Sequence, residues 1–245
     1  MIGIGLGIPR KPGSGGGASA TVITWDFSGD PSAIYQDAAG TTPAGDSDPI
    51  GLIDTEDYPM AQTDATEKPV LSVDADPSNN CAVYTNDDEQ LLNAEAAALL
   101  DDVLVDGGEF RVIMTYELSA TDSARSPVIC SIGAASGNGR LSFQDLNNQR
   151  FRVQLRNASN SNVWGFDFTE VVLTRENRYT VSLHFHEGVL DYRVNGVLVS
   201  SNTPAPLSGV DWTAGTITMS GLNINGASSG GMSAGDMLYA LQVVI

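Results

Sequence analysis

Hydrophobic and polar residues alternate strictly along residues 179–200, YTVSLHFHEGVLDYRVNGVLVS. The alternation places the apolar side chains on one face of a strand and His184 and His186 on the other face. A Glu-Gly pair follows the histidines, and Asn195-Gly196 is the preferred pair for a type I′ turn. The pattern predicts an antiparallel meander whose apolar face lies in a core and whose histidines face outward.

The same period of two recurs from residue 109 onward, with turn signals roughly every 8 to 12 residues, as in β-sandwiches. Further strands are predicted in ATVITWDFSG, KPVLSVD, CAVYTND and the terminal DMLYALQVVI. Residues 30–80 are rich in proline and read as a long irregular stretch. The Ala-Leu run in DDEQLLNAEAAALLDD, residues 87–102, predicts one short helix.

These elements predict an all-β fold: a two-sheet antiparallel jelly-roll sandwich with one short helix and an extended N-terminal arm. No repeat of fixed period is present. We expect residues 1–20 to form an anchoring peptide with a Gly-rich linker, and residues 21–245 to form a single β-sandwich domain. Cys81 and Cys130 lie in apolar surroundings and are predicted to be buried free thiols.

The composition narrows the classes of partner. Hydrophobic residues make up 42% of the chain, enough for a sizeable core, and the formal net charge is −18. A surface this acidic repels phosphate backbones and anionic lipid, so neither nucleic acid nor membrane insertion is expected. Neutral glycans, cations and basic proteins stay compatible with it.

The N-terminal sequence, MIGIGLGIPRKPGSGGGASA, has an apolar stretch with glycine at every second position. It is too short for a membrane span, and its charges follow the apolar run, which is the reverse of a secretory signal peptide. Its alternation could add a strand to the sheet edge of a partner, with the Gly-rich part as a linker. The predicted anchoring residues are Ile2, Ile4, Leu6, Ile8, Arg10 and Lys11.

Two stretches carry a resemblance to a known family. LDYRVNGVLV and the closing GDMLYALQVVI resemble the last strands of laminin-G-like, concanavalin A-like jelly rolls. AIYQDAAGTTPAGDSDPIGLI, residues 33–53, is similar to a segment in laminin-G-like proteins of tailed bacteriophages and gene transfer agents. The short MIGIGLGIPRKP start also resembles the N-termini of phage virion proteins.

The resemblance implies a virion structural protein, such as a head fibre, tail fibre or spike, made in the bacterial cytoplasm. Residues 1–12 would dock on other virion proteins, and the lectin-like domain would bind host surface polysaccharide. In this family the last strand returns to pair near the first. We expect a homo-oligomer. Two alternatives stay open: a capsid decoration protein that binds no glycan, and a glycan-degrading enzyme.

The sequence argues against catalysis. Sandwich glycosidases of the laminarinase type carry two glutamates on one face of a strand, and this chain lacks that motif. Ser/His/Asp catalysis would need His184 or His186 beside a nucleophile, and the alternation places both histidines on the outward face of the meander. We therefore expect no enzymatic activity.

Candidate binding residues lie in the turns. Polar amides and aromatic rings suit sugars, although aromatics near strand ends are more often core residues. The glycan-binding candidates are Asn160, Asn162, Trp164 and Trp212. No cofactor is expected, but the hard oxygens of DADPSNN could hold calcium, with Asp74, Asp76 and Asn79 as weak candidate ligands.

Overall fold

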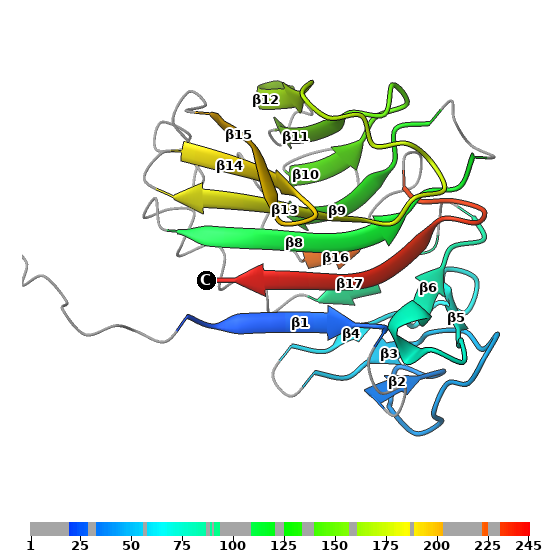
Figure 1. Cartoon of the computed structure of the whole chain (residues 1–245). Helices are drawn as coiled ribbons and strands as arrows, with labels where there is room; N and C mark the ends of the chain where they lie inside the picture. The colour runs from blue at the N-terminus through cyan, green and yellow to red at the C-terminus, as the bar shows by residue number, and fades with distance from the viewer. Residues whose placement is uncertain are drawn as a thin grey trace, which may run out of the picture.

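The computed structural model describes residues 20–28, 33–55, 58–86, 89, 91–93, 109–120, 125–133, 140–156, 161–186, 189–202, 222–224 and 231–245. In these residues the chain forms two antiparallel sheets packed around one hydrophobic core (Figure 1). This confirms the predicted all-β sandwich. No helix of the described residues is long and apolar enough to cross a bilayer.

The first sheet has the strand order β15-β14-β13-β8-β17-β6-β5, and β1 pairs with β17. Its strands are β1 (Val22–Asp26), β5 (Val70–Ser72), β6 (Cys81–Val83), β8 (Phe110–Glu117), β13 (Tyr179–His186), β14 (Val189–Val194), β15 (Val197–Asn202) and β17 (Met237–Val244).

The second sheet has the order β12-β11-β10-β9-β16-β7-β4-β3-β2. Its strands are β2 (Ile34–Tyr35), β3 (Leu52–Ile53), β4 (Met60–Ala61), β7 (Leu91–Asn93), β9 (Val128–Gly133), β10 (Arg140–Asp145), β11 (Phe151–Arg156), β12 (Asn162–Phe168) and β16 (Leu222–Ile224).

The meander predicted from the alternation forms β13, β14 and β15. Asn195 and Gly196 have φ angles of 50° and 80°, as a type I′ turn requires. Phe185 is buried and stacks on Phe110 with ring centroids 4.3 Å apart. The two histidines face outward, as predicted, but they are half-buried. The Glu-Gly reversal at residues 187–188 lies outside the described residues.

The first and last strands of the sandwich lie side by side (Figure 1). β1 pairs antiparallel with β17 from Val22 opposite Val244 to Asp26 opposite Ala240. Beyond this ladder, Thr21 and Ile245 exchange two backbone hydrogen bonds of 2.9 Å. This confirms that the last strand returns to pair with the first.

Aromatic side chains join the two sheets. Tyr192 of β14 stacks on Phe168 of β12 at 4.1 Å and on Phe151 of β11 at 5.9 Å between ring centroids. Trp25 is fully buried, and its Nε1 donates a 2.7 Å hydrogen bond to the Tyr58 carbonyl oxygen. The core thus extends from the β12 side of the sandwich to β1.

A buried carboxyl group, that of Asp145, also lies between the sheets. The hydroxyl of Tyr116 in β8 donates to Asp145 Oδ2 in β10 at 3.0 Å, and Arg175 Nη1 lies 3.6 Å from Asp145 Oδ1. Burial raises the pKa of Asp145 to about 7, against the lowering influence of Arg175 and Tyr116. Desolvation therefore outweighs both partners at this carboxyl group.

The predicted helix is wrong over Leu91–Asn93, which form β7. β7 pairs with β16 on one side and β4 on the other, and this pairing buries Leu91 completely. Cross-strand pairing and burial outweigh the helix propensity of this sequence, because propensity is a weaker determinant than tertiary context. Residues 94–102 of the predicted helix lie outside the described residues, as does the expected N-terminal arm up to residue 19.

Residues 33–80 are more regular than expected, since they contain β2 to β5 and place Ile34, Ile50 and Met60 in the core. The two cysteines are buried and free, as predicted. Burial raises the pKa of the Cys81 thiol to about 11. The division into an anchoring peptide and a sandwich domain stays a prediction.

Side-chain hydrogen bonds hold the loop within residues 33–53, the segment whose sequence resembles phage proteins. Asp37 accepts from the backbone amides of Ala39, Thr41 and Thr42 and from the Thr41 hydroxyl. Gln36 Nε2 donates to the Pro43 carbonyl and to Asp48 Oδ2. The polar residues of this segment therefore have a structural role in the loop.

Candidate functional site

The outer face of β11 carries a row of polar side chains. The residues Phe151, Val153 and Leu155 lie in the core, so Arg152 and Gln154 must face away from it. Neighbouring β12 runs antiparallel, with Asp167 opposite Arg152 and Gly165 opposite Gln154. The register therefore brings a guanidinium, a carboxylate and an amide together on one face of the second sheet.

These residues line a cavity of about 330 Å³. Its walls are formed by Arg152, Gln154, Asn162, Gly165 and Asp167. Among the described lining residues every side chain is polar, apart from glycine, which has none. Such a lining favours a ligand that is itself covered with hydrogen-bonding groups.

An ion pair fixes the charged part of the cavity. Arg152 Nε donates to Asp167 Oδ1 at 2.5 Å, and Arg152 Nη2 donates to Asp167 Oδ2 at 2.8 Å. This bidentate contact raises the pKa of Arg152, so the guanidinium stays charged. Of the five N–H donors of arginine, it engages two and leaves the others available to a ligand.

Hydrogen bonds to neighbouring protein groups orient the two side-chain amides of the cavity, those of Gln154 and Asn162. Arg156 Nε donates to Gln154 Oε1 at 2.9 Å, which leaves the Gln154 amide nitrogen as a donor. In the orientation that satisfies its surroundings, the Asn162 amide nitrogen donates to the carbonyl oxygens of Leu155 and Trp164. The Asn162 oxygen then faces hydrogen-bond donors.

Gly165 opens the floor of the cavity. A Cβ atom added at this position would lie 3.6 Å from the Asn162 amide and from the Val153 carbonyl oxygen, which are ordinary contacts. Its φ lies outside the left-handed region, so the backbone conformation itself does not require glycine. A larger side chain here would fill the cavity without straining the strand.

The polar face continues beyond the cavity onto β10. The Ser142 hydroxyl donates to the Gln154 carbonyl oxygen at 3.3 Å, and Gln144 Nε2 donates to the Ser142 hydroxyl at 3.2 Å. Both side chains are buried. Gln154 is buried as well, and these two residues, which do not line the cavity, form a hydrogen-bonded support for it.

The predicted glycan-binding residues lie in different places. Asn162 lines the cavity, whereas Trp164 packs against the core on the other face of β12. Asn160 and Trp212 lie outside the described residues, as do the predicted anchoring residues. The sequence analysis missed Arg152, Gln154, Gly165 and Asp167. The alternation in FRVQLR places Arg152 and Gln154 on an outer face. Their position next to Asp167 and Gly165 of β12 follows only from the strand register.

The weak calcium candidates form a capped turn. Asp76 accepts from the amide and hydroxyl of Ser78 and caps the short 3₁₀ helix Pro77–Asn79, and Asp74 accepts from the Asp76 amide. Arg178 Nη2 donates to Asn79 Oδ1 at 3.0 Å. The oxygens of this turn have structural partners, and calcium binding there stays a prediction.

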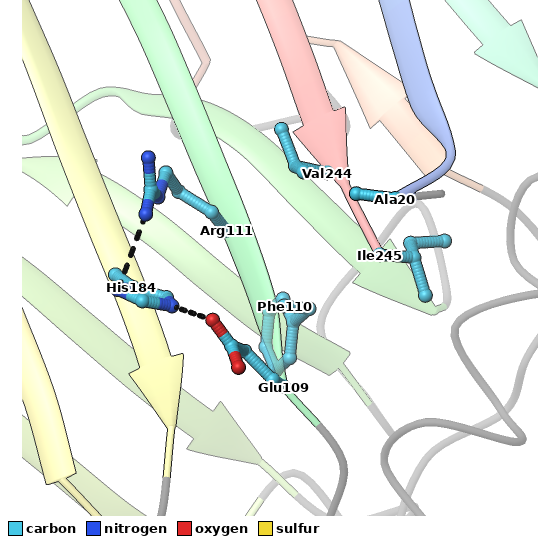
Figure 2. A pocket seen from close by; sticks show the side chains of 7 residues that line it. All are labelled: Ala20, Glu109, Phe110, Arg111, His184, Val244 and Ile245. Carbon is cyan, nitrogen blue, oxygen red and sulfur yellow. Dashed lines mark hydrogen bonds and ion pairs between the residues drawn. The ribbon is translucent and has the colours of Figure 1, made fainter. Parts of the chain in front are cut away.

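A second cavity, of about 440 Å³, lies on the outer face of the first sheet. Figure 2 shows Glu109, Arg111 and His184 along one side and Val244 and Ile245 along the other. His184 Nε2 lies 2.6 Å from Glu109 Oε1, and Arg111 Nη2 lies 3.4 Å from His184 Nδ1. This cavity has an apolar wall and is less suited than the first to a ligand rich in hydroxyl groups.

Comparison with known proteins gives a likeness of fold. No protein-family model and no curated protein matches the chain. Among solved structures, the CBM40 module of the Ruminococcus gnavus IT-sialidase, bound to α2,3-sialyllactose, is 16% identical with a TM-score of 0.42, over 55% of this chain and 74% of that one.

Two whole sialidases are also similar in chain trace. The K499G mutant of NanB sialidase from Streptococcus pneumoniae is 15% identical with a TM-score of 0.46, over 66% of this chain and 25% of that one. A Trypanosoma rangeli sialidase in complex with 2,3-difluoro-KDN is 14% identical with a TM-score of 0.49, over 96% and 33%. At this identity the function has to be argued from the cavity.

Proposed function

We propose that this protein is a non-catalytic carbohydrate-binding β-sandwich that holds a neutral glycan in the cavity on β11 and β12. The observation that carries the proposal is the uniformly polar lining of the cavity, with planar groups fixed by the Arg152–Asp167 ion pair. Neighbouring hydroxyl groups of a sugar match such planar donors and acceptors. Because the groups are already held in place, little side-chain freedom is lost on binding.

A neutral ligand fits the charges of the site and of the whole chain. Asp167 already balances Arg152, so the pair offers no net positive charge to an acidic sugar. The formal net charge of −18 would also repel a polyanionic glycan at low ionic strength. We therefore expect neutral polysaccharides to bind better than acidic ones.

The carboxylates favour binding over hydrolysis. Glycoside hydrolysis ordinarily uses two carboxyl groups that flank the scissile bond. The described lining of the cavity has one, Asp167, and it is engaged by Arg152. No reducing ends should appear when the protein is incubated with a polysaccharide that it binds.

Filling the cavity tests this proposal. Gly165→Val should weaken glycan binding at least about tenfold in titration calorimetry, a loss of about 1.4 kcal/mol, with the fold intact. Ser182→Val on the outer face of β13 is the matched control and should bind as the wild type does. Equal binding by both variants would place the glycan site elsewhere, and no binding by the wild type to any neutral glycan tested would refute the function.

We further propose that the sandwich is displayed on a virion through residues 1–12. The mutual hydrogen bonds of Thr21 and Ile245 fix where residue 20 joins the sandwich. Strand β12, whose residues line the cavity, lies on the other side of the molecule from β1 (Figure 1). A tether there would leave the cavity free to contact a cell surface. Deleting residues 1–12 should release a folded domain from particles, and copurification at wild-type stoichiometry would contradict this.

A further inference from the structure

The outer face of β13 and β14 gathers three side chains that commonly bind metal ions. His184 and His186 are two residues apart on β13 and share one face. The strand register puts Asp191 of β14 directly opposite His184. One ring nitrogen of each histidine and a carboxylate oxygen of Asp191 all lie within 4.8 Å of one another.

The state of His186 favours a ligand over a structural role. Its Nε2 is buried, and its contact with Asp191 Oδ2, 3.4 Å away, lacks the geometry of an ordinary hydrogen bond. The rings of His184 and His186 stack with centroids 4.3 Å apart.

A carboxylate orients the second ring. Glu109 Oε1 lies 2.6 Å from His184 Nε2, which matches an N–H donating to an acceptor and leaves the lone pair on Nδ1. Histidines that bind metals usually donate their other N–H to a carboxylate or a carbonyl group in this way. Glu109 would therefore be a positioning residue for His184.

We propose that His184, His186 and Asp191 form a binding site for a divalent transition-metal ion of the Zn²⁺ type. Two imidazoles and one carboxylate match the donor preference of such ions, whereas Ca²⁺ prefers sites built from oxygen alone. Bond lengths of about 2.0–2.2 Å require the donor atoms to approach to roughly 3.5 Å of one another. Side-chain rotation can supply this movement, because the three side chains rise from paired strands.

Two arginines compete with the ion. Arg111 Nη2 lies 3.4 Å from His184 Nδ1, and Arg193 Nη2 lies 3.7 Å from Asp191 Oδ2. A bound cation would have to displace the Arg111 contact and would be repelled by its charge. Removing that charge should therefore tighten metal binding, which adventitious surface binding would not predict.

The experiment uses the whole chain, whose only two histidines are these. In ¹⁵N-labelled protein, substoichiometric Zn²⁺ should shift the imidazole signals of both histidines. Titration calorimetry should give one ion per chain. His186→Ala and Asp191→Asn should each weaken Zn²⁺ at least about tenfold, whereas Arg111→Met should tighten it. Asp167→Asn, at the cavity on the other sheet, is the matched control and should leave the affinity unchanged.

Co²⁺ supplies a second measurement, because its visible absorption reports the coordination geometry. The proposal expects d–d bands that His186→Ala abolishes, with no thiolate band from the buried cysteines. Unshifted imidazole signals at 1 mM Zn²⁺, or equal Zn²⁺ affinity in wild type and His186→Ala, would overturn the site. Thermal melts of each variant without metal show whether the fold is intact. The site lies on the opposite sheet from the glycan cavity, so each proposal can fail without the other.

Discussion

At the scale of single residues, the two faces of β13 should differ in their effect on stability. Phe185 is 2% exposed and stacks on Phe110, so Phe185→Ala should lower the free energy of unfolding by about 3–5 kcal/mol. The His184 side chain is 16% exposed and contacts Glu109 and Arg111. His184→Ala should therefore cost about 1 kcal/mol, more than a fully exposed histidine would.

Urea denaturation of the two variants measures this difference. Phe185→Leu is a useful control, because it keeps most of the apolar volume and should cost less than Phe185→Ala. If His184→Ala proved as damaging as Phe185→Ala, the assignment of the core and outer faces would be wrong.

The buried Asp145 predicts a pH dependence. Its pKa is raised from 3.8 to about 7, chiefly by burial, so the folded protein binds a proton more tightly than the unfolded chain does. The stabilisation that this proton gives is complete below pH 4 and is lost as the pH rises through about 7. Urea denaturation at pH 5 and pH 8 should show the loss in the wild type.

Asp145→Asn is the control for this effect, because its amide cannot ionise and can still accept from the Tyr116 hydroxyl. The difference in stability between wild type and variant should move in favour of the variant as the pH rises from 5 to 8. A difference that does not change with pH would show that Asp145 keeps an ordinary pKa in the folded state.

A single glycine, Gly196, shapes the turn between β14 and β15. Gly196 has a φ of 80°, and a Cβ atom added there would meet nothing within 4 Å. Gly196→Val should therefore cost about 1–2 kcal/mol through backbone strain alone. Gly165→Val, in a strand without a left-handed φ, is the comparison and should cost much less in the same thermal melts. Similar losses in both would rule out backbone strain as the cause.

At the scale of elements, the loop between β2 and β3 depends on a close backbone approach. A Cβ atom at Gly51 would lie 2.3 Å from the Gln36 carbonyl oxygen and 2.9 Å from the Asp37 carbonyl carbon. Gly51→Ala must push these backbones apart, at a cost of about 1–3 kcal/mol or more. Hydrogen exchange should then accelerate at the Thr41 and Thr42 amides, which Asp37 binds.

Gly45→Ala in the same loop is the control, since its Cβ would meet only Asp48 Oδ2 at 3.4 Å. Its exchange rates at Thr41 and Thr42 should stay close to those of the wild type. Equal acceleration in both variants would mean that the loop as a whole is weakly held and that the approach at Gly51 is not critical.

Local patterns predicted the strands of this protein where alternation was strong, as in β8 and β13, and the Asn-Gly turn. They did not predict β7, because the pairing of Leu91–Asn93 with β4 and β16 depends on residues distant in the sequence. The cavity shows the same limit. Asn162 could be proposed from its turn, but the contact between Arg152 and Asp167 exists only once β11 and β12 are in register.

At the scale of the whole molecule, two candidate sites lie on opposite outer faces of one sandwich. The polar cavity is on β11 and β12 of the second sheet, and the histidine cluster is on β13 and β14 of the first. Between them lies the shared core, in which Tyr192 of β14 stacks on Phe151 of β11. The two surfaces can therefore bind different partners at the same time.

The pairing of β1 with β17 also constrains how the chain folds during synthesis. Among the described strands, β17 is the partner of β1, and it is made more than 200 residues later. While the ribosome adds the intervening strands, the backbone of β1 lacks the strand that it pairs with in the folded protein. Contacts so distant in sequence form slowly, and unpaired apolar strands promote aggregation. We therefore expect β1 to dock late, only after β17 has been made, which makes chaperone supply a determinant of the yield of folded protein.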